Sequence, residues 1–495
     1  MTPFTRRGVP RSLQRDAWWI AADAQSGVGA AQQIKFPAKP FWSLIATVIL
    51  ADIMVWQTAG GLGFVALMLI MAGIIHWLNP AINTRRTAIA WVIMIASVLP
   101  AVDLVQPLSV GFALLGLATF AILMIGGTAD AIPRAIARLP FAGVSLNRQD
   151  ALTVFKKRHA LPTGTQILRD WLMPLTLGLV FAVLMIMANP VMDRWLGKLL
   201  SFDVFYIKAD RILFWIVAAL MVWPLYRLQK AAKRLFAPVA SYRIRTGNII
   251  NHRSVVRALI LFNLIFAMQT VLDMTYLIGG AVLPEGMTYA TYAHRGAYPL
   301  LVTALLAGVF AIIAQPMLGE GRNLRVLLLI WVAQTVVLVA SSILRLDLYI
   351  GVFGLTVFRV AAFIWMGVVA AGLCLLIWQI SRRHAVSWFL PRAAVLGLAT
   401  LYVTSFVNIT GIVANHNLNR DIAMLDTFHL CYSGDGARPA IVAYNLKYDV
   451  DICGYADTPI TGPDDLREWG YRNYRLRNSV AAMKGATHEP SYLDR

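Results

Sequence analysis

The sequence predicts an all-α integral membrane protein with about eleven transmembrane helices, and three observations lead to that prediction. The chain of 495 residues is 58% hydrophobic and only 14% charged, whereas soluble domains carry about a quarter charged residues. Long apolar runs recur along the chain, each near the ~20 residues that a helix needs to cross the hydrocarbon core. Lys and Arg are concentrated in alternate connecting segments, so the net charge of +19 indicates membrane topology and not nucleic-acid binding.

The expected elements follow from these runs in chain order. We expect spans at approximately 41–58, 61–78, 88–105, 107–126, 171–189, 211–226, 256–280, 297–316, 325–344, 354–379 and 392–413. Prolines lie at or just outside several of the span ends, where they suit a helix stop. The first span follows forty rather polar residues, which is not the pattern of a cleaved signal peptide. We therefore expect a cytoplasmic or interfacial segment (1–40), a polytopic domain (41–413) and a C-terminal tail (414–495).

The distribution of Lys and Arg predicts an N-in, C-out orientation. With the N-terminus inside, 28 of the 44 basic residues lie in inner segments and five in short outer loops, as the positive-inside rule requires. The longest inner loop, 127–170, carries Lys156, Lys157 and Arg158 in a row, and we expect it to contact anionic lipid headgroups. In a bacterium this orientation places the protein in the inner (cytoplasmic) membrane and its tail in the periplasm.

The three cysteines fall in two environments. Cys374 lies in an apolar span, where a small buried hydrophobe is expected. Cys431 and Cys453 both lie in the tail, on the oxidising side of the membrane. We predict a disulfide between them, the alternative being two free buried thiols. It would close a loop of about twenty residues and contribute roughly 3 kcal/mol.

Common catalytic and cofactor motifs are absent from the sequence. It contains no phosphate-binding Gly-rich loop, no His-Glu-x-x-His, no Cys-x-x-Cys-His and no Gly-x-Ser-x-Gly. The tail histidines His416 and His429 could form a metal site with Asp421 or Asp426, but such residues in a tail are more often simply solvated. We therefore predict no cofactor and no metal, and an enzymatic activity is less expected than a binding role.

Polar residues within the spans are costly in the membrane and so indicate function. Gln269, Asp273 and Tyr276 share one face of the seventh span, and Asp273 lies about 10 Å below its outer end. Arg359 lies at similar depth in the tenth span, so we expect the two charges to pair. Asn408 belongs to a further polar stripe in the last span. A structural ion pair that locks the bundle and a ligand-binding site both remain possible interpretations.

An unusually polar cassette, "MTYATYAHRGAYPL", precedes the eighth span. Interfacial tyrosines are expected at a membrane boundary, but a His-Arg-Gly sequence is not. We interpret the cassette, together with the next outer loop, as a polar vestibule above the level of Asp273. The candidate binding residues are Asp273, Arg359, Gln269, Tyr276, Tyr289, Tyr292, His294, Arg295, Tyr349, Thr356 and Asn408.

Two stretches carry a resemblance to a known family. The pattern Tyr-Ala-x-Tyr-Ala-x-x-Gly occurs at residues 289–296, and Tyr-x-x-x-x-Gly-Leu-Thr-x-x-Arg occurs at residues 349–359. The sequence from roughly 255 to 450 resembles a bacterial multi-pass membrane family known only as a domain of unknown function, of the 4153/4173 type. The resemblance implies the same fold class and no established activity.

Two functions from different classes are compatible with the sequence. The first is binding or transport of a small molecule or lipid at an outward-facing polar site within the helix bundle. The second is a non-catalytic envelope sensor or scaffold that acts through an unidentified membrane or periplasmic protein. A pathway through the membrane needs polar groups in the inner half as well, and Asn263 is the one clear candidate there, which favours an outward-facing binding site.

Overall fold

The computed structural model describes residues 38–158 except 59, 81 and 82, then 209–237, 252–275, 302–314 except 313, 322–420, 427–454, and 460–486 except 461, 462 and 464. In these ranges every element is a helix. Seven helices are long and apolar enough to cross a membrane, and the bent pair α9–α10 makes an eighth if it counts as one span. The protein is therefore a multi-pass membrane protein. The predicted span 171–189 lies outside the described residues, and the total of eleven stays a prediction.

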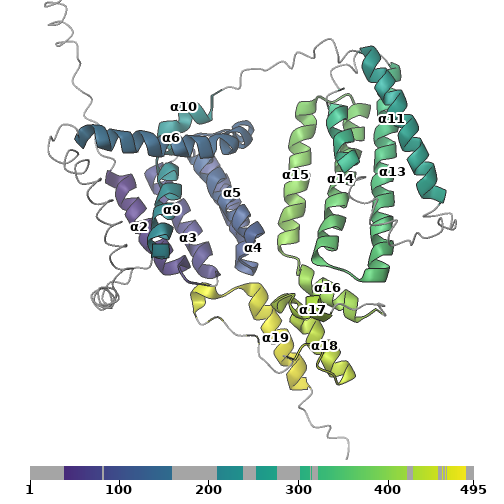
Figure 1. Ribbon diagram of the computed structural model, residues 1–495. Helices are drawn as coiled ribbons and strands as arrows, with labels where there is room; N and C mark the ends of the chain where they lie inside the picture. The colour runs from purple at the N-terminus through teal and green to yellow at the C-terminus, as the bar shows by residue number, and fades with distance from the viewer. Residues whose placement is uncertain are drawn as a thin grey trace, which may run out of the picture.

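Five apolar helices of the N-terminal part of the chain form one bundle (Figure 1). Its members are α2 (Ala38–Val55), α3 (Leu62–Leu78), α4 (Thr84–Asp103), α5 (Pro107–Met124) and α9 (Ala209–Tyr226). The closest packing is between α4 and α5, where a Cβ on Gly116 would lie 1.7 Å from the Ser97 hydroxyl oxygen. Small residues at such a contact let two backbones approach, which drives helix association in lipid, where no hydrophobic effect operates between helices.

Two polar helices cover the end of this bundle where α3 ends. The long helix α6 (Ile132–Arg158) lies across the bundle, and α10 (Leu228–Leu235) continues from α9 after a 65° bend (Figure 1). Arg138 donates to the carbonyls of Leu235 (3.1 Å) and Ala237 (2.5 Å), which satisfies carbonyls left without partners at the α10 C-terminus. The predicted inner loop 127–170 is thus largely helical between residues 129 and 158.

Asp150 fixes α6 to the bent pair. Its carboxylate accepts hydrogen bonds from Trp223 (3.1 Å), Lys230 (2.5 Å) and Arg227 (3.3 Å). Burial raises the pKa of Asp150, but the hydrogen bond from Lys230 and the charges of both basic groups outweigh it, so the pKa lies below its ordinary value. Asp150 therefore stays ionised in the folded protein down to more acidic pH than in the unfolded chain.

We expect Asp150→Asn to lower the free energy of unfolding at pH 7 by about 1–2 kcal/mol, because charge-assisted hydrogen bonds are lost. The contribution of a carboxylate with a lowered pKa is full above its unfolded pKa of about 4 and disappears as the pH falls through the folded pKa. The variant and the parent should therefore converge below pH 4 in denaturant unfolding in detergent. Asp130→Asn, at an exposed carboxylate nearby, is the control, and an equal effect of both changes would contradict the prediction.

The remaining spans and one shorter apolar helix form a second bundle with its own core. Its members are α11 (His252–Asp273), the short helix Val302–Ile312, α13 (Arg322–Phe353), α14 (Val357–Ser381) and α15 (Val386–Ser405). Trp331 of α13 lies at the centre, with ring centroids 5.2–5.6 Å from Phe262, Phe266 and Phe310. Asn263 donates to the Leu327 carbonyl (3.1 Å), so this polar group joins α11 to α13.

The predicted last span, 392–413, is wrong at its C-terminal end. Helix α15 stops at Ser405, and a separate helix, α16 (Ile409–Leu418), begins after Asn408, whose side chain accepts from the Gly411 amide (3.1 Å). Asn408 is thus an N-cap residue, a role for which Asn is strongly preferred. Because the helix ends between Thr404 and Asn408, these residues do not continue one helix face. The predicted boundary at 413 falls inside α16, which packs against the tail.

The tail is a small helical unit at the end of both bundles (Figure 1). It contains α17 (Thr427–Cys431), η5 (Asp435–Ala437), α18 (Arg438–Tyr448), η6 (Leu466–Glu468) and α19 (Tyr471–Ala486). Leu430 of α17, Ile441 of α18 and Ala414 of α16 are buried together. Cys431 and Cys453 form a disulfide, with Cα atoms 5.5 Å apart, which confirms the predicted pairing.

Reduction of this disulfide should destabilise the tail by about 3 kcal/mol, because the open chain regains the entropy of a 22-residue loop. We expect Cys431→Ser to have the same effect, measured as faster proteolysis of residues 427–454 in the purified protein. Cys374→Ser, at the free cysteine of α14, should leave that rate unchanged. A tail whose cleavage rate does not respond to reductant would contradict the prediction.

The tail also completes the turn between α2 and α3. The Leu62 amide donates to the Trp469 carbonyl (3.0 Å), and Arg467 donates to the Ile53 carbonyl. A Cβ on Gly61 would lie 2.4 Å from the Glu468 backbone, so only glycine allows this approach. The sequence "GGLG" at 60–63 is therefore both a turn and a docking surface for the tail.

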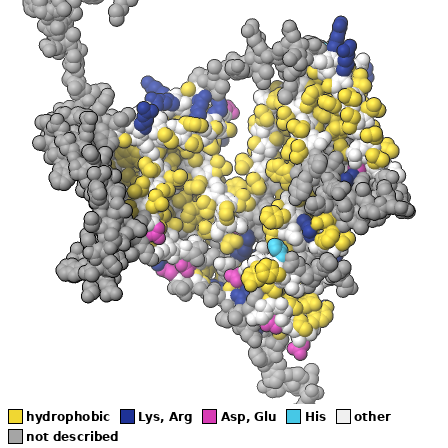
Figure 2. Space-filling view, in the orientation of Figure 1, with side chains coloured by type: hydrophobic (Ala, Val, Ile, Leu, Met, Phe, Trp, Pro, Cys, Tyr) yellow, Lys and Arg dark blue, Asp and Glu magenta, His cyan; other side chains and the backbone are white. Residues whose placement is uncertain are grey.

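Charged side chains divide between the two ends of the molecule. Figure 2 shows Lys and Arg gathered at the end of α6 and α10 and at the corresponding end of the second bundle, with apolar side chains between the ends. Acidic side chains lie mostly toward the tail (Figure 2). The molecule thus has a basic end, an apolar belt and a tail end.

Candidate functional site

Asp273, the last residue of α11, belongs to a buried polar cluster with α13. Its carboxylate is 3% exposed and accepts hydrogen bonds from Gln269 Nε2 (2.8 Å), Ser341 Oγ (2.5 Å) and Arg345 Nη2. Arg345 is equally buried. The predicted partnership of Gln269 with Asp273 on one helix face is present in the structure, and the cluster joins two helices through a compensated pair of charges.

The predicted pairing of Asp273 with Arg359 is wrong, because Arg345 is the partner. The sequence placed Arg345 in an outer loop after a span ending at 344. Helix α13 instead continues to Phe353, so Ser341 and Arg345 stand one helical turn apart on the face toward α11. The signal was present in the sequence as an i, i+4 spacing of two polar residues, but the end of the apolar run was taken as the end of the helix.

Arg359 stabilises the turn between α13 and α14. Its Nη1 donates to the carbonyls of Phe353 (2.9 Å) and Gly354, and its guanidinium lies 4.6 Å from the Tyr349 ring centroid. Thr356 is the N-cap of α14 and accepts from the Arg359 amide (3.3 Å). Arg359 is therefore in the first turn of α14 and not, as predicted, about six residues inside the span. Three predicted site residues, Tyr349, Thr356 and Arg359, form one local structure.

The same turn is fixed from the tail side. Gly354 has φ +73°, a left-handed conformation that favours glycine, and both backbone groups of Leu355 bind the Asn417 side chain (2.7 and 2.8 Å). Each constant position of the pattern at 349–359 thus has a structural role in this turn. We conclude that this pattern reflects how α13, α14 and α16 are joined.

Five predicted site residues lie outside the described residues, namely Tyr276, Tyr289, Tyr292, His294 and Arg295. The predicted vestibule that they would form therefore remains a prediction. The neighbouring loop assigned to it, residues 345–353, is the last part of α13, so Tyr349 belongs to a helix and not to a loop.

A polar cavity of about 470 Å³ lies where the two bundles meet the tail. We call it the junction cavity. It is built from the α4–α5 turn, the break between α15 and α16, and helices of the tail, and Asn408 is the predicted site residue that lines it. Its polar lining residues are Gln106, Thr404, Asn408, Thr410, Ser433, Asp435, Arg472 and Asn473. Leu108, Val357, Ile409 and Leu476 supply apolar wall.

Arg472 of α19 holds the parts of this cavity together. Its guanidinium binds Asp103 at the end of α4 (2.9 and 2.5 Å) and donates to the Ser405 carbonyl (2.8 Å). Gln106 donates to the same carbonyl (2.9 Å). Asp103 lies at the end of an apolar helix and is 8% exposed. Sequence reasoning missed Arg472 because no local pattern links it to a residue 369 positions earlier.

The junction cavity offers hydrogen-bonding groups to a ligand, and its lining carries little net charge. Arg472 is compensated by Asp103, and Asp435, whose side chain is 54% exposed, has only a 3.5 Å contact with Arg438. The side-chain amide of Asn473 has no hydrogen-bond partner among the described residues. Amides, hydroxyls and one accessible carboxylate can hold a small polar molecule, and a volume of this size is typical of such sites.

Two helical bundles joined at one end by a disulfide-bonded helical tail define a multi-pass membrane protein with a polar cavity at the junction of its parts. The family model for the domain of unknown function DUF4153 matches residues 44–444. The chain belongs to this family. No curated protein and no solved structure matches the chain.

Proposed function

We propose that the protein binds a small polar molecule in the junction cavity on the outer side of a bacterial inner membrane. The observation that carries the proposal is the cavity itself, about 470 Å³ with eight polar side chains from three separate parts of the chain. The buried Asp273–Arg345 pair, by contrast, is compensated within the second bundle and fits a structural latch. The binding role predicted from the sequence is therefore assigned to the junction cavity.

The orientation in the proposal is N-in, C-out. The basic end formed by α6 and α10 lies opposite the tail (Figure 2), which fits a cytoplasmic basic end under the positive-inside rule. The tail disulfide fits an oxidising compartment. An alkaline phosphatase fusion after residue 486, expressed in bacteria, should be active, and a green fluorescent protein fusion at the same place should be dark. The reverse pattern would overturn the orientation.

Binding is tested with the purified full-length protein in detergent, by screening small polar compounds for an increase in unfolding temperature. A cavity ligand should lose its effect in Asn473→Leu, which removes a side-chain amide with no other partner among the described residues, and in Leu108→Trp, which fills the cavity. Asn478→Leu, at an exposed position of the same helix α19, is the matched control and should keep the effect. A stabilising compound that acts equally on all three variants would overturn the assignment of the cavity.

A sensor or scaffold role is the second candidate, and one observation favours it. The tail touches the first bundle through Arg467 and Arg472 and the second through Asn408 and Asn417, so a change in the tail would alter both bundles. Cross-linking in native membranes distinguishes the two functions. A partner held through the tail and released by Asn473→Arg would support the scaffold role.

A further inference from the structure

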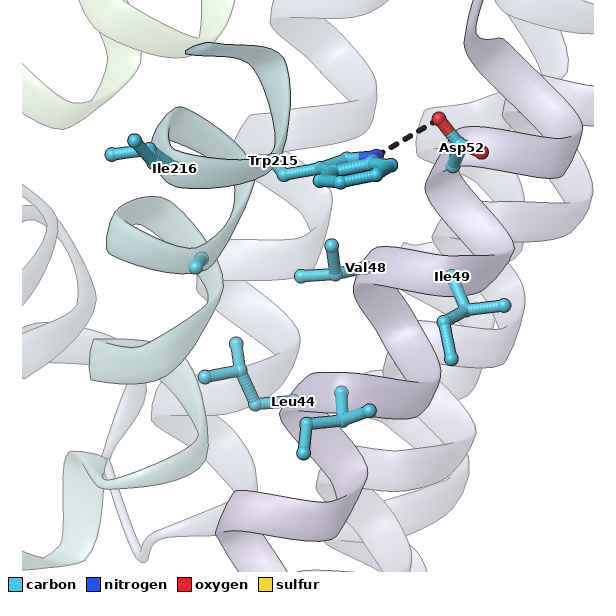
Figure 3. A pocket seen from close by; sticks show the side chains of 8 residues that line it. Leu44, Val48, Ile49, Asp52, Trp215 and Ile216 are labelled. Atoms are coloured by element: carbon cyan, nitrogen blue, oxygen red, sulfur yellow. Dashed lines mark hydrogen bonds between the residues drawn. The ribbon is translucent and has the colours of Figure 1, made fainter. Parts of the chain in front are cut away.

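A second cavity lies between α2 and α9, in the membrane-spanning part of the first bundle. It has a volume of about 390 Å³. Figure 3 shows Leu44 and Val48 of α2 pointing toward α9 and Trp215 of α9 pointing toward α2, with Ile49 and Ile216 directed outward on either side. We call it the α2–α9 groove. Ile49 and Ile216 at its rim are 54% and 51% exposed. The groove thus opens through apolar side chains, as expected for a surface that faces lipid.

The groove has the length of one leaflet. From Leu44 to Asp52 it follows α2 over eight residues, about 12 Å at the helical rise, whereas half of a hydrocarbon core is about 15 Å. Its polar end lies near the end of α2 and in the first turn of α9, on the side where Arg467 of the tail binds the Ile53 carbonyl. An acyl chain lying in the groove would therefore place its phosphate at this polar end.

The polar end contains the guanidinium of Arg211, which keeps one nitrogen available for a ligand. Arg211 binds the Asp52 carboxylate through Nε (2.8 Å) and Nη2, and Trp215 donates to the same carboxylate (2.9 Å; Figure 3). Arg211 Nη1 has no partner among the described residues, and the Arg211 side chain is 41% exposed. Arginine recognises phosphate oxygens through such free N–H groups.

The charges at this end select the headgroup. Among the described side chains at this end, Asp52 pairs with Arg211 and Arg467 pairs with Asp465, so the exposed Asp210 adds one negative charge. A headgroup with net negative charge would meet a carboxylate beside the guanidinium. A zwitterionic headgroup with a primary ammonium matches both groups, its phosphate at Arg211 and its ammonium at Asp210. A quaternary ammonium has no N–H to donate to that carboxylate.

We propose that the α2–α9 groove binds one glycerophospholipid with an ethanolamine-type headgroup, drawn from the leaflet on the tail side. One acyl chain lies along Val48 and Ala219, and the phosphate accepts a hydrogen bond from Arg211 Nη1. This site is separate from the junction cavity, which takes a polar molecule, and it does not depend on the proposed function.

The test is native mass spectrometry of the full-length protein, delipidated in detergent and titrated with phosphatidylethanolamine, phosphatidylcholine or phosphatidylglycerol of identical acyl chains. We expect the ethanolamine lipid to form the first adduct at roughly tenfold lower concentration, as one charge-assisted hydrogen bond allows. Equal binding of the three lipids, or stronger binding of the glycerol lipid, would overturn the proposal.

Three variants connect the adduct to the groove. Ala219→Phe fills the groove and should abolish the first adduct, whereas Ala46→Phe, at an exposed position of α2 outside the lining, should retain it. The double variant Asp52→Asn, Arg211→Gln keeps a neutral hydrogen-bonded pair and should lose the headgroup preference. An unfolding temperature within a few degrees of the parent confirms that each variant is folded. A dimer that Ala219→Phe dissociates would assign the groove to a second copy of the chain and overturn the lipid site.

Discussion

Replacing Arg345 with Met should lower the free energy of unfolding by about 3–5 kcal/mol, because the change removes the guanidinium that pairs with the buried Asp273 carboxylate. Asp273 is 3% exposed and also accepts hydrogen bonds from Gln269 and Ser341. These two neutral donors do not replace the charge of the guanidinium. The measurement is denaturant or thermal unfolding of the purified protein in one detergent.

The double variant Asp273→Leu, Arg345→Met separates an isolated charge from a general packing defect. Removing both charges should restore most of the lost stability, since a buried ion pair replaced by apolar groups is often neutral, although Ser341 and Gln269 then lose a partner. Arg359→Met should cost only about 1 kcal/mol, because it removes hydrogen bonds to backbone carbonyls and no ion pair. If Arg359→Met proved more damaging than Arg345→Met, the assignment of the Asp273 partner would be wrong.

The second large effect is expected at Arg472. Arg472→Met removes the bonds to Asp103 and to the Ser405 carbonyl and leaves a carboxylate that is 8% exposed without its cation. We expect a loss of about 3 kcal/mol and release of α19 from the end of α4. Limited proteolysis should then cleave within residues 471–486 many times faster than in the parent.

The control for this prediction lies on the same helix. Arg475 is exposed and contacts the Tyr471 ring at 5.9 Å, so Arg475→Met should change the stability by no more than about 0.5 kcal/mol. The second bundle offers an internal check as well, since the Asp273–Arg345 pair joins α11 to α13, and Arg345→Met should leave the proteolysis rate of α19 unchanged. If α19 were equally resistant to proteolysis in Arg472→Met and Arg475→Met, Arg472 would not be the residue that holds α19 in place.

Membrane class and most described spans could be predicted from the sequence because hydropathy and length decide them. The predicted spans 41–58, 61–78 and 107–126 each agree within a few residues with α2, α3 and α5. The disulfide was predictable for a different reason, since two cysteines in one short segment have few alternatives. Helix ends were harder to predict from the sequence. The apolar run ends at 344 but α13 ends at Phe353, because Arg345 is paired with Asp273 inside the bundle and does not need to be solvated by water.

The candidate site was predictable only in part, for physical reasons. Gln269 and Asp273 are four residues apart, so helical periodicity places them together. Asp103 and Arg472 are brought together by the fold alone, and a single sequence carries no signal of that contact. Asn408 was selected as a polar residue in a span, yet it lines the junction cavity because the helix breaks there. Its polarity identified Asn408 as a candidate. Its environment could not be predicted, because the break between α15 and α16 was not predicted.

The contact of the tail with Gly61 and Ile53 also has a consequence for biosynthesis. The hydrogen bond from Arg467 to the Ile53 carbonyl joins residues 414 positions apart. In the proposed N-in, C-out orientation, the hairpin of α2 and α3 enters the membrane early in translation, but the turn between them acquires its partner only after residue 469 has been made and has crossed the membrane. Until then the Leu62 amide has water as its partner. Chains that stop translation before α19 should insert their spans normally and still be recognised by quality-control proteases at their first turn.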